Sequence, residues 1–340
     1  MSNQKWIAMR LSRNIHRFSY YPETTDGNIW IDYINKELDK YPIDVIMPIF
    51  ETGIRRLIAY QEKIKNPKAL GLLASLENFD TAINKNSLVK FLQNHNMAVP
   101  KTIYMNGGAR DKVLEYPLIV KPVEGYGGGQ GVWLLHNREE EDLYFKRAEF
   151  GKHFLIQEFI EGYDVGCSVL CKDGKIVSYT IQKELQKAVN ALGPLSGMEF
   201  IKEERVYKIV ESLMSKLNWS GIAHVDLRYD RDKGDYKIIE INTRFWSSME
   251  GSEIAGVNFP YLYCLASMGE QIIPDDYKNA RFYNLKGLIK LFQEDKTILI
   301  DQLFILKNTQ MKYVVKDPVP YVFKFIKRTK NIWVKGANIS

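Results

Sequence analysis

Cysteine is scarce in this sequence. Cys167, Cys171 and Cys264 are an odd number without CxxC spacing, so no disulfide framework is indicated. The sequence also lacks an apolar run of about 18 residues, and no basic, apolar, small-residue leader opens it, so neither a membrane span nor secretion is predicted. We therefore expect a protein of the reducing cytoplasm.

Excess charge is absent from most of the chain. The formal net charge is +6, but residues 301–340 hold eight Lys and Arg against two Asp, which leaves residues 1–300 neutral. A nucleic-acid-binding protein usually carries a basic patch on its folded domain, so nucleic acid is not a predicted partner. Hydrophobic residues at 45% and charged residues at 26% are ordinary globular values, which exclude disorder, collagen and coiled coil as overall descriptions.

The 340 residues suggest two or three compact units. Apolar residues 43–50 come before Glu51 and predict a buried parallel strand leading into a helix. Apolar spacing predicts helices over residues 86–96 and 203–217. Short β-type runs separated by turns predict antiparallel strands over residues 117–122, 132–135, 154–159, 165–170, 175–182, 221–229 and 236–241.

The segment 117–132 is the most informative part of the sequence. An apolar strand delivers Lys121 and is followed by five glycines within residues 125–131. Such a loop can direct several backbone N–H groups at phosphate oxygens. Its spacing matches neither a P-loop nor the GxGxxG fingerprint, so both common nucleotide motifs are excluded. A plain hairpin tip is the alternative interpretation.

A second group of polar residues lies on a strand that is otherwise apolar. Glu240, Asn242 and Arg244 occupy every second position along the strand, after Ile238 and Ile239, and period-two spacing places their side chains on one face. Asp226 on the partner strand of a hairpin can join them, giving hard oxygen ligands that suit Mg²⁺ bound with substrate phosphates. A solvated sheet face with one ion pair is the alternative, but polar side chains on a core strand favour a functional explanation.

Taken in order, these motifs resemble the ATP-grasp superfamily, nearest its biotin-carboxylase and carbamoyl-phosphate-synthetase branch. The resemblance covers roughly residues 44–269 and is carried by Lys85 before a helix, Ile-Val-Lys121, the glycine loop, Gln157-Glu-Phe-Ile-Glu-Gly-Tyr-Asp164, Asp226 and Glu240-Ile-Asn-Thr-Arg244. It implies an α/β (α+β) ATP-grasp fold in which two antiparallel-sheet subdomains sandwich ATP. The implied divisions are a shortened N-terminal parallel α/β domain (1–84), a small subdomain with a glycine-rich lid (85–155), a large subdomain with the metal site (156–275) and a basic extension (276–340).

The resemblance also implies a site for ATP and Mg²⁺ (or Mn²⁺), with two ions. Lys85 and Lys121 would contact the phosphates, Gln157 and the backbone near Phe159 the adenine, and Asp164 the ribose, while Arg244 would face the reacting acid. The implied cofactor-binding residues are Lys85, Lys121, Gly125, Gly127, Gly128, Gly129, Gly131, Gln157, Glu158, Phe159, Ile160, Asp164 and Gln182. The implied metal ligands are Asp226, Glu240 and Asn242, and the implied catalytic residues are Arg244 and Lys187.

The implied activity is an ATP- and Mg²⁺-dependent carboxylate–amine ligase that acts through an acyl phosphate on small-molecule substrates. Two alternatives stay open: a bicarbonate-activating carboxylase or carbamoyl-phosphate-type enzyme, and a nucleotide-binding protein without catalysis. The sequence also leaves open a homodimer and a peripheral contact of the basic tail with an anionic membrane.

The start of the chain departs from the family pattern. Residues 6–10 resemble the second strand of the family's N-terminal domain, and the glycine-bearing unit before them is short or missing. That departure leaves open the acceptor pocket, to which this domain usually contributes, and whether the sequence is truncated.

Overall fold

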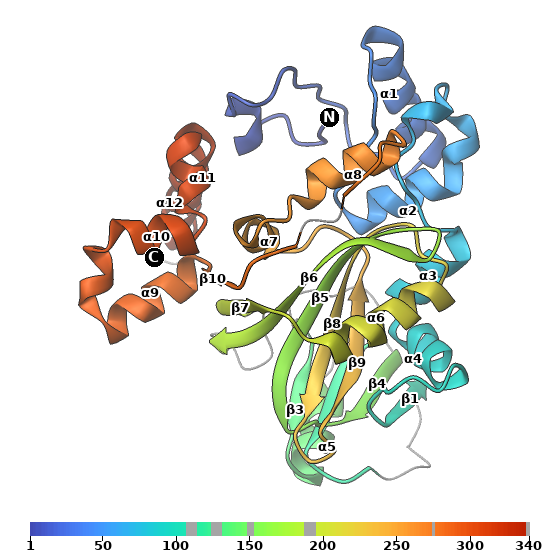
Figure 1. Ribbon diagram of the computed structural model, residues 1–340, viewed down its shortest axis with the longest axis vertical. Coiled ribbons are helices and arrows are strands. Elements are labelled where there is room, and N and C mark those ends of the chain that lie inside the picture. Colours follow the sequence, from blue (N-terminus) through green and yellow to red (C-terminus); the bar gives the residue numbers. More distant parts are fainter. Residues whose placement is uncertain (107–113, 124–130, 148–152, 187–194, 274–275, 338–340) are drawn as a thin grey trace.

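Two antiparallel sheets form the centre of the protein in a computed structural model (Figure 1). The structure describes residues 1–106, 114–123, 131–147, 153–186, 195–273 and 276–337. One sheet has the strand order β1-β4-β2-β3 and the other β10-β7-β6-β5-β8-β9. The strands are β1 (Thr102–Asn106), β2 (Leu118–Pro122), β3 (Trp133–Leu135), β4 (His153–Glu158), β5 (Gly162–Lys172), β6 (Lys175–Gln186), β7 (Gly197–Ile201), β8 (Gly221–Asp230), β9 (Asp235–Asn242) and β10 (Ala280–Tyr283). The predicted pair of antiparallel sheets is confirmed.

Helices surround both sheets, and α6 crosses one face of the larger sheet (Figure 1). The α-helices are α1 (Gly27–Lys40), α2 (Glu51–Tyr60), α3 (Leu76–Ile83), α4 (Lys85–Asn94), α5 (Arg138–Arg147), α6 (Glu204–Lys216), α7 (Met249–Ala255), α8 (Phe259–Ser267), α9 (Leu285–Glu294), α10 (Gln302–Asn308), α11 (Met311–Lys316) and α12 (Pro318–Ala337). The 3-10 helices are η1 (Ala8–Leu11), η2 (Gln61–Lys63), η3 (Pro67–Ala69) and η4 (Lys296–Leu299). Among the helices of these described segments, none is both long and apolar enough to cross a bilayer.

Alternation along the strands separates a core face of the larger sheet from a polar face. On β5, Val165, Cys167 and Val169 are buried in a cluster with apolar residues of α6. The residues between them, Gly166 and Ser168, lie on the opposite face because successive strand side chains point to opposite sides. The same alternation runs along β8, and a bulge in β9 between Ile238 and Glu240 keeps Glu240 and Asn242 on the side of Asp226. The polar residues of all three strands therefore share one side of the sheet.

The smaller sheet is built in the same way. Leu118, Val120 and Ile156 are fully buried in its core. Lys121 follows Val120 directly on β2, so its side chain leaves the sheet on the other face. This face of the smaller sheet supplies the cationic half of the site described below.

The first 84 residues differ from the predicted parallel α/β unit, because no strand ladder forms there among the described residues. The predicted strand over residues 43–50 is wrong: Ile46 makes a single parallel bridge to Leu70. Pro48 has no N–H to donate, and the side chain of Phe50 is 71% exposed, so no second layer covers the segment. The helix predicted after it, α2, does form.

Residues 6–10, expected to be a strand, contain a 3-10 helix instead. This helix, η1, begins at Ala8, and the only sheet-like pairing of its neighbourhood within the described residues is a bridge between Ser2 and Tyr20. Arg10 turns back over the ring of Trp6. Without a neighbouring strand to supply a hydrogen-bond ladder, the extended conformation gains little here.

Candidate active site

Four positions from four adjacent strands form one row across the polar face of the larger sheet. Gln182 on β6 lies opposite Gly166 on β5, Gly166 opposite Asp226 on β8, and Asp226 opposite Glu240 on β9. A Cβ atom at Gly166 would come within 2.6 Å of the His224 ring and 3.2 Å of Gln182 Cγ. Any side chain at position 166 would clash with these neighbours, so only glycine allows the strands of this row to lie as close as they do.

Asp226 and Glu240 form a carboxylate pair that Asn242 links. Asn242 Nδ2 donates to Asp226 Oδ2 at 2.7 Å and lies 3.5 Å from Glu240 Oε1. Partial burial, together with the neighbouring Asp226 carboxylate, raises the pKa of Glu240, and Lys85 and Lys121 oppose that rise. The pair therefore carries negative charge that the protein neutralises only in part.

His224 contacts Asp226, one member of this carboxylate pair. Its Nε2 lies 3.2 Å from Asp226 Oδ1, its Nδ1 lies 2.7 Å from Ser168 Oγ, and its ring stacks on Trp246. Both ring nitrogens have partners and the residue is 5% exposed. We interpret His224 as a residue that orients Asp226.

Two lysines from the other half of the molecule face the carboxylates. Lys85 begins α4, its backbone N–H donates to Val123 O at 3.4 Å, and its Nζ lies 4.0 Å from Glu240 Oε2. Lys121 is only 4% exposed. Burial lowers the pKa of Lys121 to about 8, although the Glu240 carboxylate favours its charged form. The structure thus brings the predicted phosphate contacts and the predicted metal ligands together.

Arg244 lies just beyond the end of β9 and reaches the N-terminal segment. Its Nε lies 3.6 Å from Glu51 Oε1, one Nη donates to Phe245 O at 3.1 Å, and the other lies 3.5 Å from Asn242 Oδ1. Sequence reasoning did not assign Glu51 to the site. Its position at the end of an apolar run, as the first residue of α2, is the signal that was available.

Arg228 hydrogen-bonds to the segment between β4 and β5, which connects the two sheets. Arg228 Nε donates to Ile160 O at 2.6 Å, one Nη donates to Asp164 Oδ1 at 2.6 Å, and the guanidinium lies 5.4 Å from the Phe159 ring centroid. Gln157, predicted to lie at the adenine, is 3% exposed and donates to Thr102 Oγ1 at 2.8 Å. Arg228 was not assigned a role from sequence, although its spacing from Asp226 places it on the same face.

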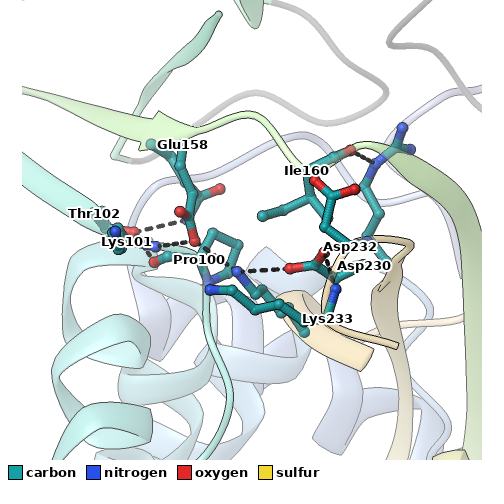
Figure 2. A network of polar contacts seen from close by, with 11 residues as sticks. Pro100, Lys101, Thr102, Glu158, Ile160, Asp230, Asp232 and Lys233 are labelled. Atoms are coloured by element: carbon teal, nitrogen blue, oxygen red, sulfur yellow. Dashed lines mark hydrogen bonds and ion pairs between the residues drawn. The ribbon is translucent and has the colours of Figure 1, made fainter. Parts of the chain in front are cut away.

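Glu158, one of the predicted cofactor-binding residues, directs its side chain into a network of polar contacts (Figure 2). Lys237 Nζ donates to Glu158 Oε1 at 2.7 Å and lies 3.1 Å from Asp230 Oδ2, and Lys101 N donates to Glu158 Oε1 at 2.8 Å. Burial alone would lower the pKa of Lys237, but its hydrogen bonds to both carboxylates raise it. This network joins β4 of the smaller sheet to the β8–β9 hairpin of the larger one.

The remaining predicted residues divide into two groups. Gln182 is 5% exposed and its Oε1 accepts from Ser248 Oγ at 2.9 Å, and Gly131 has a φ of 72° that favours glycine. The other predicted residues lie outside the described part of the chain; they are Gly125, Gly127, Gly128, Gly129 and Lys187.

The donor set limits what kind of metal fits. Within the described residues no group of three or more His, Cys, Asp or Glu side chains is placed to hold a metal ion. The site offers two carboxylates, Asp226 and Glu240, beside one amide, Asn242. Mg²⁺ is commonly bound through one or two carboxylates while substrate phosphates and water complete its shell, so this set fits Mg²⁺ held together with a nucleotide.

The order of these elements matches a known domain family. A family model described as an ATP-grasp domain matches residues 82–248, which begin just before Lys85 and end just after Arg244. The chain carries an ATP-grasp domain. The match includes both lysines, the carboxylate pair and the connection between the sheets.

Among curated proteins, the ATP-grasp chain is similar to a D-aspartate ligase of Enterococcus faecium. The two are 25% identical over 212 residues, which is 52% of this chain and 49% of the relative. The matched region thus spans about half the length of that ligase.

Among solved structures, N5-carboxyaminoimidazole synthetase from Staphylococcus aureus, complexed with ADP, has a TM-score of 0.65 at 18% identity, covering 82% of this chain and 74% of that one. The biotin carboxylase domain of the Hydrogenobacter thermophilus 2-oxoglutarate carboxylase, in complex with MgADP and bicarbonate, has a TM-score of 0.58 at 16% identity, covering 77% and 62%. At these identities the likeness establishes the ATP-grasp fold.

Proposed function

We propose that this protein is an ATP- and Mg²⁺-dependent ligase that phosphorylates a substrate carboxylate and then joins the resulting acyl phosphate to an amine. The observation that carries the proposal is the meeting of Lys85 and Lys121 with Asp226 and Glu240 inside an ATP-grasp domain. The similarity to a D-aspartate ligase supports the carboxylate and amine substrate classes.

The lysines act on the phosphates of ATP. Phosphoryl transfer needs little covalent chemistry from the protein, because catalysis consists mainly of positioning the groups and neutralising their charge. Lys121 is held rigidly by its burial, and Lys85 is fixed at the start of α4. Both ammonium groups are therefore placed before ATP binds, and no reorganisation is needed at the moment of transfer.

Asp226, Glu240 and Asn242 would hold magnesium, in two ions by analogy with the family. Bound magnesium would neutralise phosphate charge and orient the transferred group. Burial and the neighbouring Asp226 carboxylate raise the pKa of Glu240, and a divalent cation bound beside the pair would neutralise this charge.

Arg244 would hold the carboxylate that is phosphorylated. A guanidinium matches a carboxylate with two parallel hydrogen bonds. In the structure Asn242, the Phe245 carbonyl and Glu51 all contact this guanidinium and orient it. The γ-phosphate then passes to a carboxylate oxygen, and the amine displaces phosphate from the acyl carbon.

Oxygen-18 tests this path. An ADP-release screen with Mg²⁺ across amino acids, hydroxy acids and bicarbonate, alone and in pairs, first identifies the substrates. We then expect one labelled oxygen per turnover to move from the substrate carboxylate into inorganic phosphate, because the bond between that oxygen and the acyl carbon breaks in the second step. Mass spectrometry of the released phosphate measures it.

Unlabelled substrate in labelled water serves as the control for hydrolysis. Unlabelled phosphate during coupled turnover would contradict acid activation, and label in AMP would indicate an adenylate instead. Bicarbonate as the only productive acid would favour the carboxylase or carbamoyl-phosphate alternative. Binding of ATP without ADP release by any pair would support the inactive nucleotide-binding protein.

A second test addresses the metal ligands. We expect Glu240→Gln to raise the KM for Mg²⁺ by at least about tenfold. Because the pKa of Glu240 is raised, protons compete with Mg²⁺ above the ordinary carboxyl range, so the wild-type KM should increase as pH falls and the variant should lose that dependence. Steady-state ADP release against Mg²⁺ concentration at several pH values measures both effects.

The matched control is Glu199→Gln, on β7 of the same sheet, where the carboxylate pairs with Arg281. It should leave the KM for Mg²⁺ unchanged. Equal magnesium dependence in the wild type and in Glu240→Gln would remove Glu240 from the proposed metal site.

A further inference from the structure

Exposed apolar side chains gather where the C-terminal helices meet the N-terminal segment. Helix α12 packs against η1 and α11, on the side of the molecule that Figure 1 shows at the left, away from α5. Five large apolar side chains there are between 52% and 65% exposed. We name them the tail patch: Trp6, Met9, Val315, Val319 and Val322.

Helix α12 and the residue before it are held against the N-terminal segment. Asp317, 9% exposed, accepts hydrogen bonds from Ser12 Oγ and from Asn14 Nδ2, and Pro320 is buried. Lys327 Nζ donates to Trp6 O at 3.3 Å. Val319 and Val322 are three residues apart and share the outer side of the helix. A group of large apolar side chains that stays exposed on the surface of a folded protein often marks an interaction site.

The charge of the C-terminal segment around the patch is mainly positive, and Glu250 of α7 lies close enough to interact with Lys324. Residues 301–340 hold eight basic residues against two acidic ones, and one of the two, Asp317, is buried in the contact with the N-terminal segment. The exposed lysines next to the patch are Lys312, Lys316, Lys324 and Lys327. A second copy docking through the same surface would set like charges against each other. A negatively charged partner fits better.

We propose that the tail patch binds the surface of an anionic lipid bilayer, with α12 lying in the plane of the interface. Its valines would enter the boundary between headgroups and acyl chains while the lysines contact lipid phosphates. Trp6 is of the residue type that favours this boundary. The contact is peripheral, since no helix of the described segments could span a bilayer, and it is independent of the proposed ligase activity.

Vesicle co-sedimentation of the full chain tests the proposal. We expect binding to vesicles of phosphatidylcholine with phosphatidylserine, little binding to phosphatidylcholine alone, and weakening by salt. The double variant Val319→Asp, Val322→Asp should reduce the bound fraction by about tenfold or more, because it places charges at the apolar boundary. Leu143→Asp on α5, where the side chain is 49% exposed, is the matched control and should bind as the wild type does.

A charge series keeps the test independent of the folding of the double variant. Lys312→Gln, Lys316→Gln and Lys324→Gln should each weaken binding by about fivefold. Equal binding to neutral and anionic vesicles, or full binding by the double variant, overturns the proposal. A dimer in sedimentation equilibrium that the double variant abolishes, without vesicle binding by the wild type, assigns the patch to a second copy and also overturns it.

Discussion

Lys121→Met is expected to make the protein more stable and to abolish turnover. Burial lowers the pKa of Lys121 from 10.5 to about 8, which corresponds to a cost of up to about 3 kcal/mol for keeping the ammonium charged at neutral pH. Methionine has a similar shape and no charge, so it removes that cost. It also removes a phosphate contact, and ATP affinity should fall with activity.

The pH dependence of the increase in stability tests whether burial of the charged lysine causes it. Between pH 8 and 10.5 the unfolded chain binds more protons at this lysine than the folded chain, so the cost is full below pH 8 and fades as pH rises toward 10.5. Urea unfolding at pH 7 and at pH 10 should therefore show a larger difference between wild type and variant at pH 7. Lys85→Met, at a less buried lysine, should lose turnover without that gain in stability.

An equal stability difference at both pH values would show that burial of the charge is not its source. Unchanged ATP affinity in Lys121→Met, measured by calorimetry, would remove Lys121 from the phosphate site.

Lys237→Ala is expected to cost about 3 kcal/mol of stability, because it leaves the buried carboxylate of Asp230 and the half-buried carboxylate of Glu158 without their cation. Lys237 is 8% exposed on its side chain and holds Glu158 and Asp230. The pKa values of both carboxyls are lowered, since their hydrogen bonds to Lys237 and to backbone N–H groups outweigh the opposing effect of burial. Their stabilisation is thus present at neutral pH and is lost as pH falls. The cost of Lys237→Ala should shrink in acid, as urea unfolding at pH 7 and pH 4 can measure.

Two control variants test whether the loss of stability comes from the unpaired carboxylates. Lys233→Ala, at an exposed side chain in the same hairpin, should change stability by less than about 0.5 kcal/mol. The triple variant Lys237→Met, Glu158→Gln, Asp230→Asn should recover most of the loss because no buried charge remains. A triple variant as unstable as Lys237→Ala would mean that packing, and not charge, sets the effect.

Sequence patterns predicted seven of the ten strands that the structure describes, together with the chemical character of the site, but they missed β1, β7 and β10. Alternation along β8 depends only on backbone geometry, whereas the bulge in β9 could not be read from the sequence. The order of the motifs identified the ATP-grasp domain. The same reasoning was wrong for residues 6–10 and 43–50. An apolar run forms a strand only where a neighbouring strand supplies its hydrogen bonds, and that neighbour cannot be read from the run itself.

The sequence by itself determined which residue types are available for phosphate and Mg²⁺, because spacing along one strand places Glu240, Asn242 and Arg244 on one side. Only the tertiary structure decided that Asp226 lies opposite Glu240, that Lys85 lies across from Glu240, and that Lys237 joins the two sheets. The physical reason is that strand register and the packing of one sheet against the other depend on contacts between residues distant along the chain. No local pattern encodes those contacts.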